Sequence, residues 1–152
     1  MEAFDPIRHI AGSSSILEPD GTWPSFYESE VHSFNFWRGD FQTDGATFTS
    51  PEIEVSIEMS TNEIPYLVDF KFHECDFIEM SNFNHQNVIE EFKLSFEERL
   101  FYSDGVTPLP VTPIQPYICV KIGTPNYTVA LSFKCLKVEV VGKRDILQPT
   151  RK

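Results

Sequence analysis

The chain has 152 residues, a formal net charge of −11 and a hydrophobic fraction of 41%. This length predicts a single domain, residues 1–152, that folds without a disulfide or metal staple. No apolar run reaches the roughly 18 residues of a membrane span, and MEAFDPIRHIAG at the start lacks the basic and apolar segments of a signal peptide. We therefore expect a cytoplasmic protein with no membrane partner.

The acidic residues are concentrated in the first half of the chain. Residues 1–80 contain 16 Asp and Glu against 3 Lys and Arg, whereas residues 81–152 contain 7 against 9. An acidic half repels the phosphates of nucleic acid and attracts a basic protein or a cation. We expect no nucleic-acid partner, and plain solubility is the alternative explanation for the acidity.

A short helix is predicted over about residues 6–11, because Asp5-Pro6 fits an N-cap followed by proline at the first helical position. A loop follows, and then apolar and polar residues alternate in three segments, as they do in half-buried strands. These segments are VHSFNFW (31–37), PEIEVSIEM (51–59) and YLVDFKF (66–72).

Two details of this alternation concern the sides of the strands. In the first strand, His32 falls on the same side as Phe34 and Phe36. After the third strand, HECD (73–76) changes the alternation, which predicts a turn or a bulge before FIEM (77–80).

The second half of the chain is also rich in strand patterns. Residues 88–97 fit either a helical face or a strand, and the strict alternation from Phe92 to Glu97 favours a strand. Four prolines in 103–116 exclude a central strand and indicate an extended loop. YICVKIG (117–123) and YTVALSFKCLKVEVVG (127–142) predict two or three further strands.

These elements predict a mainly β (α+β) fold, a largely antiparallel sheet of about seven or eight strands with a short N-terminal helix. Short connections between successive strands favour antiparallel pairing, and the alternation within each strand indicates a sheet with one covered face.

The sequence lacks the common catalytic motifs. It contains no G-x-S-x-G, H-E-x-x-H or G-x-G-x-x-G and no glycine-rich phosphate loop, so we predict neither an enzyme nor a cofactor. The densest titratable cluster is His73, Glu74 and Asp76, with His85 nearby. A solvated turn is the structural explanation for this cluster, and a metal or catalytic site is the alternative.

The three cysteines, Cys75, Cys119 and Cys135, lie in apolar or strand-like segments without C-x-x-C spacing. They fit reduced, packed thiols, with a zinc site or a disulfide as the alternative.

Two polar surfaces could bind a partner. Glu52, Glu54 and Glu58 share one face of a predicted strand, spaced to remain ionised and to meet a row of Lys or Arg. The segment SNFNHQN (81–87) is rich in amides, which fits a tight loop with local hydrogen bonds or a recognition loop. A solvated sheet face is the alternative for the glutamates.

A family resemblance is carried by WPSFYESEV (23–31), FNHQNVI (83–89) and VALSFKCLKVEVVG (129–142), together with Phe70 and Phe72. In this order they resemble the immunity protein 50 family of bacterial polymorphic toxin systems, over about residues 4–142. The family often has His-Asp where this chain has Tyr27-Glu28, so the acid is kept and the imidazole is lost.

The resemblance implies a small cytosolic antidote that binds and blocks a cognate toxin made by the same cell or its kin. The family-like positions Trp23, Pro24, Asn84, Gln86 and Asn87 are then mainly structural.

The binding surface expected for such an antidote occludes a basic toxin domain by charge, with aromatic anchors carrying the affinity. Its candidate residues are Tyr27, Glu28, Glu52, Glu54, Glu58, Phe101 and Tyr102. The alternative is a small β-sheet enzyme or ligand-binding domain using His73, Asp76 and His85. An oligomerising module with open sheet edges is a third possibility.

Overall fold

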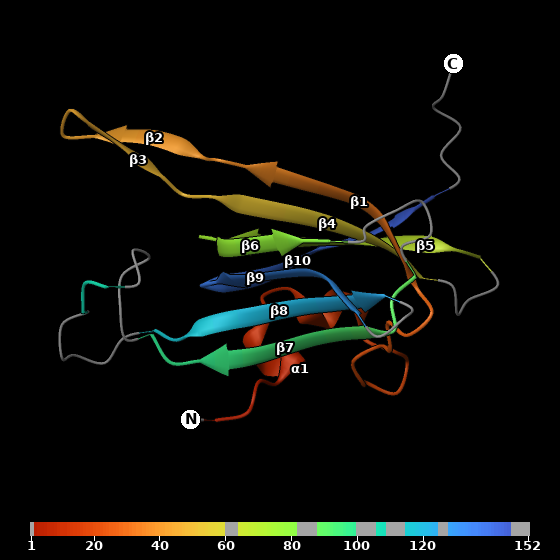
Figure 1. Ribbon diagram of the computed structural model, residues 1–152. Helices are drawn as coiled ribbons and strands as arrows, with labels where there is room; N and C mark the ends of the chain where they lie inside the picture. The colour runs from red at the N-terminus through yellow and green to blue at the C-terminus, as the bar shows by residue number, and fades with distance from the viewer. Residues whose placement is uncertain are drawn as a thin grey trace, which may run out of the picture.

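The computed structural model describes residues 2–59, 64–81, 88–99, 106–108, 115–124 and 128–146. Within this part of the chain, ten strands form two four-stranded antiparallel sheets and a separate two-stranded hairpin (Figure 1). The elements are α1 (Pro6–His9), η1 (Ser13–Ile16), β1 (Glu30–Trp37), β2 (Asp40–Thr43), β3 (Ala46–Thr49), β4 (Glu52–Met59), β5 (Tyr66–His73), β6 (Asp76–Met80), β7 (Glu91–Glu97), β8 (Tyr117–Thr124), β9 (Thr128–Cys135) and β10 (Lys137–Asp145).

The two sheets are joined by a bend in their shared strands. Sheet I has the order β1-β4-β5-β10 and sheet II the order β6-β9-β8-β7. β5 continues into β6 through Glu74 and Cys75, and β9 continues into β10 through Leu136, whose backbone N donates to the His73 carbonyl at 3.0 Å. One antiparallel ribbon therefore runs through both sheets, as at the corners of orthogonally packed sheets.

The opposite side is closed by a contact between the start of β1 and the segment before β7. Glu30 forms an antiparallel bridge with Val88, and the Ile89 backbone N donates to the Ser29 carbonyl at 2.7 Å. The strands therefore follow one another around a flattened barrel. Beyond Glu30, β1 has only β4 as a strand partner among the described residues, so it forms an open edge.

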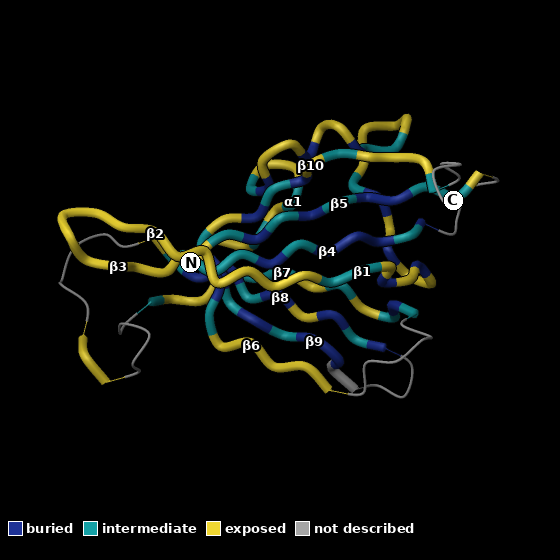
Figure 2. Tube along the Cα trace, turned by 90° about the horizontal axis from the view of Figure 1, so that it is seen from above, coloured by how far each residue is buried: buried dark blue, intermediate teal, exposed yellow. Residues whose placement is uncertain are grey.

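The inner faces of the two sheets pack against each other through aromatic rings. Phe72 of β5 lies edge-on to Phe133 of β9 with ring centroids 4.9 Å apart, and Phe70 lies edge-on to Phe92 of β7 at 5.4 Å. Edge-to-face pairs of this kind add about 0.5–1.5 kcal/mol beyond the area that they bury. Each sheet thus buries one apolar face (Figure 2).

The N-terminal segment covers the sides of β10 and β7. Asp5 caps α1 by accepting from the Ile7 backbone N, and Ala11 pairs in parallel with Glu139 of β10. The Phe4 ring packs on Phe96 of β7 at 5.0 Å. Among the described residues, no helix has the length and apolar character to cross a membrane.

The predicted mainly β fold with a short N-terminal helix is confirmed, and the strand predicted over 88–97 is β7. The described residues form ten strands rather than about seven or eight. They make two larger sheets instead of one, and the change of alternation at 73–76 is the bend between them. The hairpin β2–β3 was not predicted, although Asp44-Gly45 is a strong turn signal.

The placement of His32 beside Phe34 and Phe36 is wrong. The register of β1 against β4 shifts between Val31 and Ser33, so His32 is the bulged residue and is exposed. Val31 occupies the buried position instead, opposite Ile57. A bulge inserts one residue and therefore exchanges the two faces of the strand on its N-terminal side.

Replacing Trp23 by alanine should destabilise the fold. The ring is partly buried, with its centroid 5.7 Å from that of Phe26 and 6.3 Å from that of Phe70. We expect a loss of about 2–3 kcal/mol, below the ~3–5 kcal/mol of fully buried aromatic truncations. Urea unfolding of Trp23→Ala measures this, and a parent-like stability would show that the ring does not support the core.

Candidate functional site

The outer face of sheet I collects most of the predicted acidic site. Glu52, Glu54 and Glu58 lie there on β4, all half-buried, with their apolar neighbours turned inward. The strand register places Asp69, Lys71 and His73 of β5 and Lys137 and Glu139 of β10 on the same face. This face has two halves with different electrostatics.

The half formed by β5 and β10 neutralises its acids internally. The His73 ring lies between two carboxylates, with Nδ1 3.5 Å from Glu52 Oε1 and Nε2 2.9 Å from Glu139 Oε1. Lys71 Nζ also lies 3.4 Å from Glu52. The hydrogen bond from His73 holds the pKa of Glu139 below its ordinary value.

A second pairing completes this half. Arg144 Nε donates to the Asp69 carboxylate at 2.8 Å, and its Nη2 donates to the Ser56 hydroxyl at 3.3 Å. Ser56 in turn donates to the other oxygen of Asp69. These acids therefore have cationic or hydroxyl partners within the fold.

Three acids of β1 and β4 on this face form no such ion pair among the described residues. Glu30 of β1 lies directly opposite Glu58 of β4, and Glu54 lies farther along the same face. Within the part of the chain that the structure describes, no ion pair involves any of these three. Like charges directly opposite on neighbouring strands are destabilising by about 0.2–1 kcal/mol.

An exposed aromatic residue ends the same surface. Trp37 of β1 lies opposite Glu52, and 59% of its surface is exposed. The sequence predictions did not include Trp37 or Glu30 as binding residues. The alternation of Phe34 and Phe36 already indicated that Trp37 points outward. We call the surface of Glu30, Trp37, Glu52, Glu54 and Glu58 the acidic face.

Two of the remaining predicted binding residues lie just before β1. Tyr27 is exposed before β1, and Glu28 has a φ of +65° and a backbone N that donates to the Ile89 carbonyl. Trp23 is partly buried and Pro24 is buried. Several candidates lie outside the described residues: Asn84, His85, Gln86, Asn87, Phe101 and Tyr102.

Of the alternative site, His73 and Asp76 lie within the described residues and His85 lies outside them. His73 is held by Glu52 and Glu139, and Asp76 lies in β6 beyond the bend, where burial raises its carboxyl pKa. In the described ranges, no group of three or more His, Cys, Asp or Glu is arranged to hold a metal ion.

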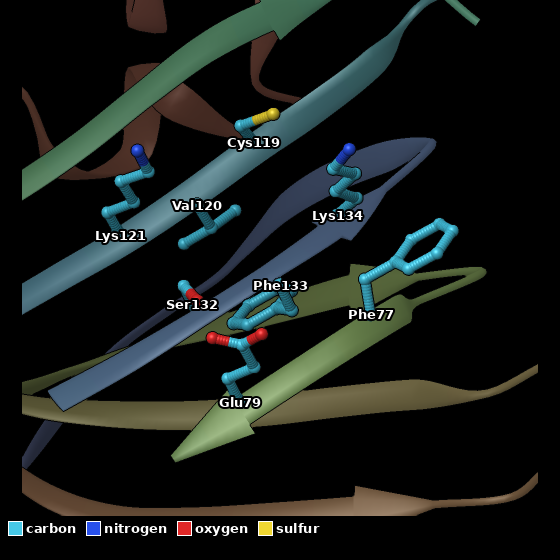
Figure 3. A pocket seen from close by; sticks show the side chains of 8 residues that line it. All are labelled: Phe77, Glu79, Cys119, Val120, Lys121, Ser132, Phe133 and Lys134. Atoms are coloured by element: carbon cyan, nitrogen blue, oxygen red, sulfur yellow. The ribbon is translucent and has the colours of Figure 1, made fainter. Parts of the chain in front are cut away.

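A hollow of about 270 Å³ lies instead on the outer face of sheet II (Figure 3). Its lining comes from β6, β8 and β9 and consists of Phe77, Glu79, Cys119, Val120, Lys121, Ser132, Phe133 and Lys134. Neither His73 nor Asp76 lines it. Lys134 Nζ forms an ion pair with Glu97 Oε2 of β7 at 2.6 Å and lies 5.0 Å from the centroid of the Phe77 ring.

The three cysteines are free thiols, and Cys75 and Cys135 are buried in the core, as predicted. Burial raises the pKa of Cys75 to about 12 and that of Cys135 still further. Cys119 lies in the hollow on sheet II, where burial and its hydrogen bond to Glu97 raise its pKa to about 11.

In comparisons with known proteins, no protein-family model, no curated protein and no solved structure matches this chain.

The thiols should react slowly in the native protein. For Cys119, a pKa of about 11 instead of 9.0 leaves roughly 100-fold less thiolate at pH 8. We expect slow labelling by Ellman's reagent in buffer and fast labelling of all three thiols in urea. Fast native labelling of any one thiol at pH 8 would contradict its placement.

Proposed function

We propose that this chain is a cytoplasmic immunity protein of a bacterial polymorphic toxin system, which binds a basic toxin domain and occludes its active surface. The observation that carries the proposal is the acidic face. Glu30, Glu54 and Glu58 form no ion pair among the described residues, although Lys71 of β5 lies opposite Glu54, whereas Asp69 and Glu139 on the same face are paired.

Charge favours a protein with a basic surface as the partner. The chain carries a net charge of −11, which repels nucleic acid and attracts cationic surfaces from a distance. Carboxylates on the acidic face speed encounter with such a surface and set the orientation of docking. A basic partner would also relieve the repulsion between Glu30 and Glu58, so binding itself would stabilise the arrangement.

Aromatic anchors would supply most of the affinity. Trp37 is exposed at the end of the acidic face, and tryptophan is among the residues that most often dominate binding energy at interfaces. Tyr27 is exposed before β1, near Glu30 in sequence. The family resemblance of WPSFYESEV (23–31) and FNHQNVI (83–89) supports the same function.

The acidic face should control the rate of association. The test uses the toxin domain encoded beside the gene for this chain and replaces Glu30, Glu54 and Glu58 together by Gln. We expect association about tenfold slower at low salt, with the difference shrinking as salt is raised. Stopped-flow binding and protection of cells that express the toxin measure the effect. The melting temperature should stay the same or rise slightly, since like-charge repulsion is removed.

A matched control removes the same number of charges elsewhere. Glu79, Glu91 and Glu98 are exposed and lie on or next to sheet II, so their replacement by Gln should leave association near the parent rate. Equal slowing by both triple variants would mean that net charge, not the acidic face, steers binding. The proposed function fails if the parent neither binds nor neutralises that toxin domain.

A further inference from the structure

The hairpin β2–β3 forms an arm that projects beyond the two sheets (Figures 1 and 2). Its two strands pair only with each other among the described residues. Every residue of the arm, defined as 38–49, is exposed. An isolated two-stranded hairpin is only marginally stable in water. A hairpin that extends from the body of the protein therefore suggests a role in function rather than in stability.

The arm nevertheless has a defined shape and direction. Asp44 and Gly45 form its tip with φ values of +50° and +77°, which is the two-residue turn of type I′ that matches strand twist. At its base, Gly39 has a φ of +66° and accepts from the Ser50 backbone N at 2.9 Å. A Cβ at Gly39 would collide with the Ser50 carbonyl oxygen, so the backbone passes closely there.

The sides of the arm are aromatic. Phe41 and Phe48 lie opposite each other with stacked rings 5.7 Å apart, and 48% and 47% of their surfaces are exposed. Phe36 and Trp37 follow at its base and are exposed to a similar extent. Two exposed aromatic residues on the arm and two at its base are characteristic of an interface, because aromatic side chains are enriched at the centres of protein–protein contacts.

The unpaired charge of the arm lies at its tip. Arg38 Nε lies 2.9 Å from Asp40 Oδ1, so these two charges neutralise each other at the base. Asp44 is the one charged residue of the arm outside an ion pair in the structure as described. The arm therefore presents one aromatic pair, Phe41 and Phe48, among polar side chains, and an anionic tip. A second copy of this chain is a poor occupant for it, since two chains of charge −11 repel.

We infer that the arm is a plug that enters a cleft of the basic partner, with apolar walls against Phe41 and Phe48 and a cationic floor that receives Asp44. This inference rests on the proposed function and specifies which shape of partner surface is occluded. Trp37 belongs both to the acidic face and to the base of the arm, so the two surfaces are continuous. The acidic face would then dock on the rim of the cleft that the arm fills.

Two variants of the arm test the inference with the toxin domain encoded beside the gene. Phe41→Thr with Phe48→Thr removes the rings and keeps residues that favour strands. Asp44→Asn removes the charge and keeps a residue that suits the turn. We expect affinity to fall about 30-fold or more for the double variant and about three- to tenfold for Asp44→Asn.

Ile64→Thr is the matched control, since Ile64 is equally apolar and 66% exposed but lies outside the arm. It should bind like the parent. All variants should keep the parental melting temperature, because β2 and β3 pair with no strand of the two sheets. For a plug, we expect the arm variants to dissociate faster than the parent. Their association should remain as dependent on salt as that of the parent.

Each contrary outcome has a distinct meaning. Parent-like affinity of both arm variants, with slow association of the acidic-face variant, overturns the plug and leaves the proposed function intact. No binding by the parent overturns both. If sedimentation shows a parental dimer that Phe41→Thr with Phe48→Thr converts to monomer, the arm joins two copies of this chain and the plug is wrong.

Discussion

The bend in the ribbon of β5–β6 and β9–β10 is the constraint on which the rest of the structure depends. Because two neighbouring strands pass together from sheet I to sheet II, the sheets face each other at a fixed angle. Cys75 is buried at this bend, and Leu136 is tied across it to the His73 carbonyl. The inner faces must then meet as one core, and the outer faces must point in opposite directions.

Because of this geometry, the uneven distribution of acidic residues along the chain becomes a difference in charge between the two sheets. Sheet I draws three of its four strands from residues 30–73, the acidic part of the sequence, whereas all of sheet II lies within 76–135. Its outer face carries Lys121 and Lys134, with Lys93 directly opposite Lys121. The acidic face therefore lies on the outer side of sheet I, whereas the outer side of sheet II mixes these lysines with Glu79, Glu91 and Glu97, of which Glu97 pairs with Lys134.

Within sheet I, neighbouring strands treat charge differently. On β5 and β10 the register brings Lys71, His73 and Arg144 to the acids, and each pairing stabilises the native state or at least offsets repulsion. On β1 and β4 the same register sets Glu30 against Glu58 with no cation between them. Unfavourable local arrangements, such as two like charges side by side, are commonly found at functional sites. We therefore interpret the pair of Glu30 and Glu58 as part of a binding surface.

The arm likewise keeps groups on the surface that would be more stable with a partner, and here the groups are aromatic rings. A hairpin that buried Phe41 and Phe48 on the body would gain roughly 1.5–3 kcal/mol for each ring. The chain instead holds them outward behind a type I′ turn, with a close backbone approach at Gly39. Exposed aromatic side chains on a preorganised support lose little entropy on binding, so they suit a contact with a partner better than a role in folding.

The sequence by itself determined the features that depend on near neighbours in the chain. Alternation of apolar and polar residues identified the strands, because successive side chains of a strand point to opposite sides. Asp5 determined the start of α1 through its hydrogen bond to the Ile7 backbone N. The altered alternation at 73–76 marked the bend. Asp44-Gly45 also carried enough local information to predict the arm.

Only the tertiary structure decided which charges are compensated. Glu139 and Arg144 follow β5 by more than 60 residues, so no local pattern reveals that they meet His73 and Asp69. The bulge at His32 moves Glu30 to the outer face, opposite Glu58, where simple alternation would turn it inward. A register shift depends on how one strand settles against another, and that choice is made by packing across the whole sheet.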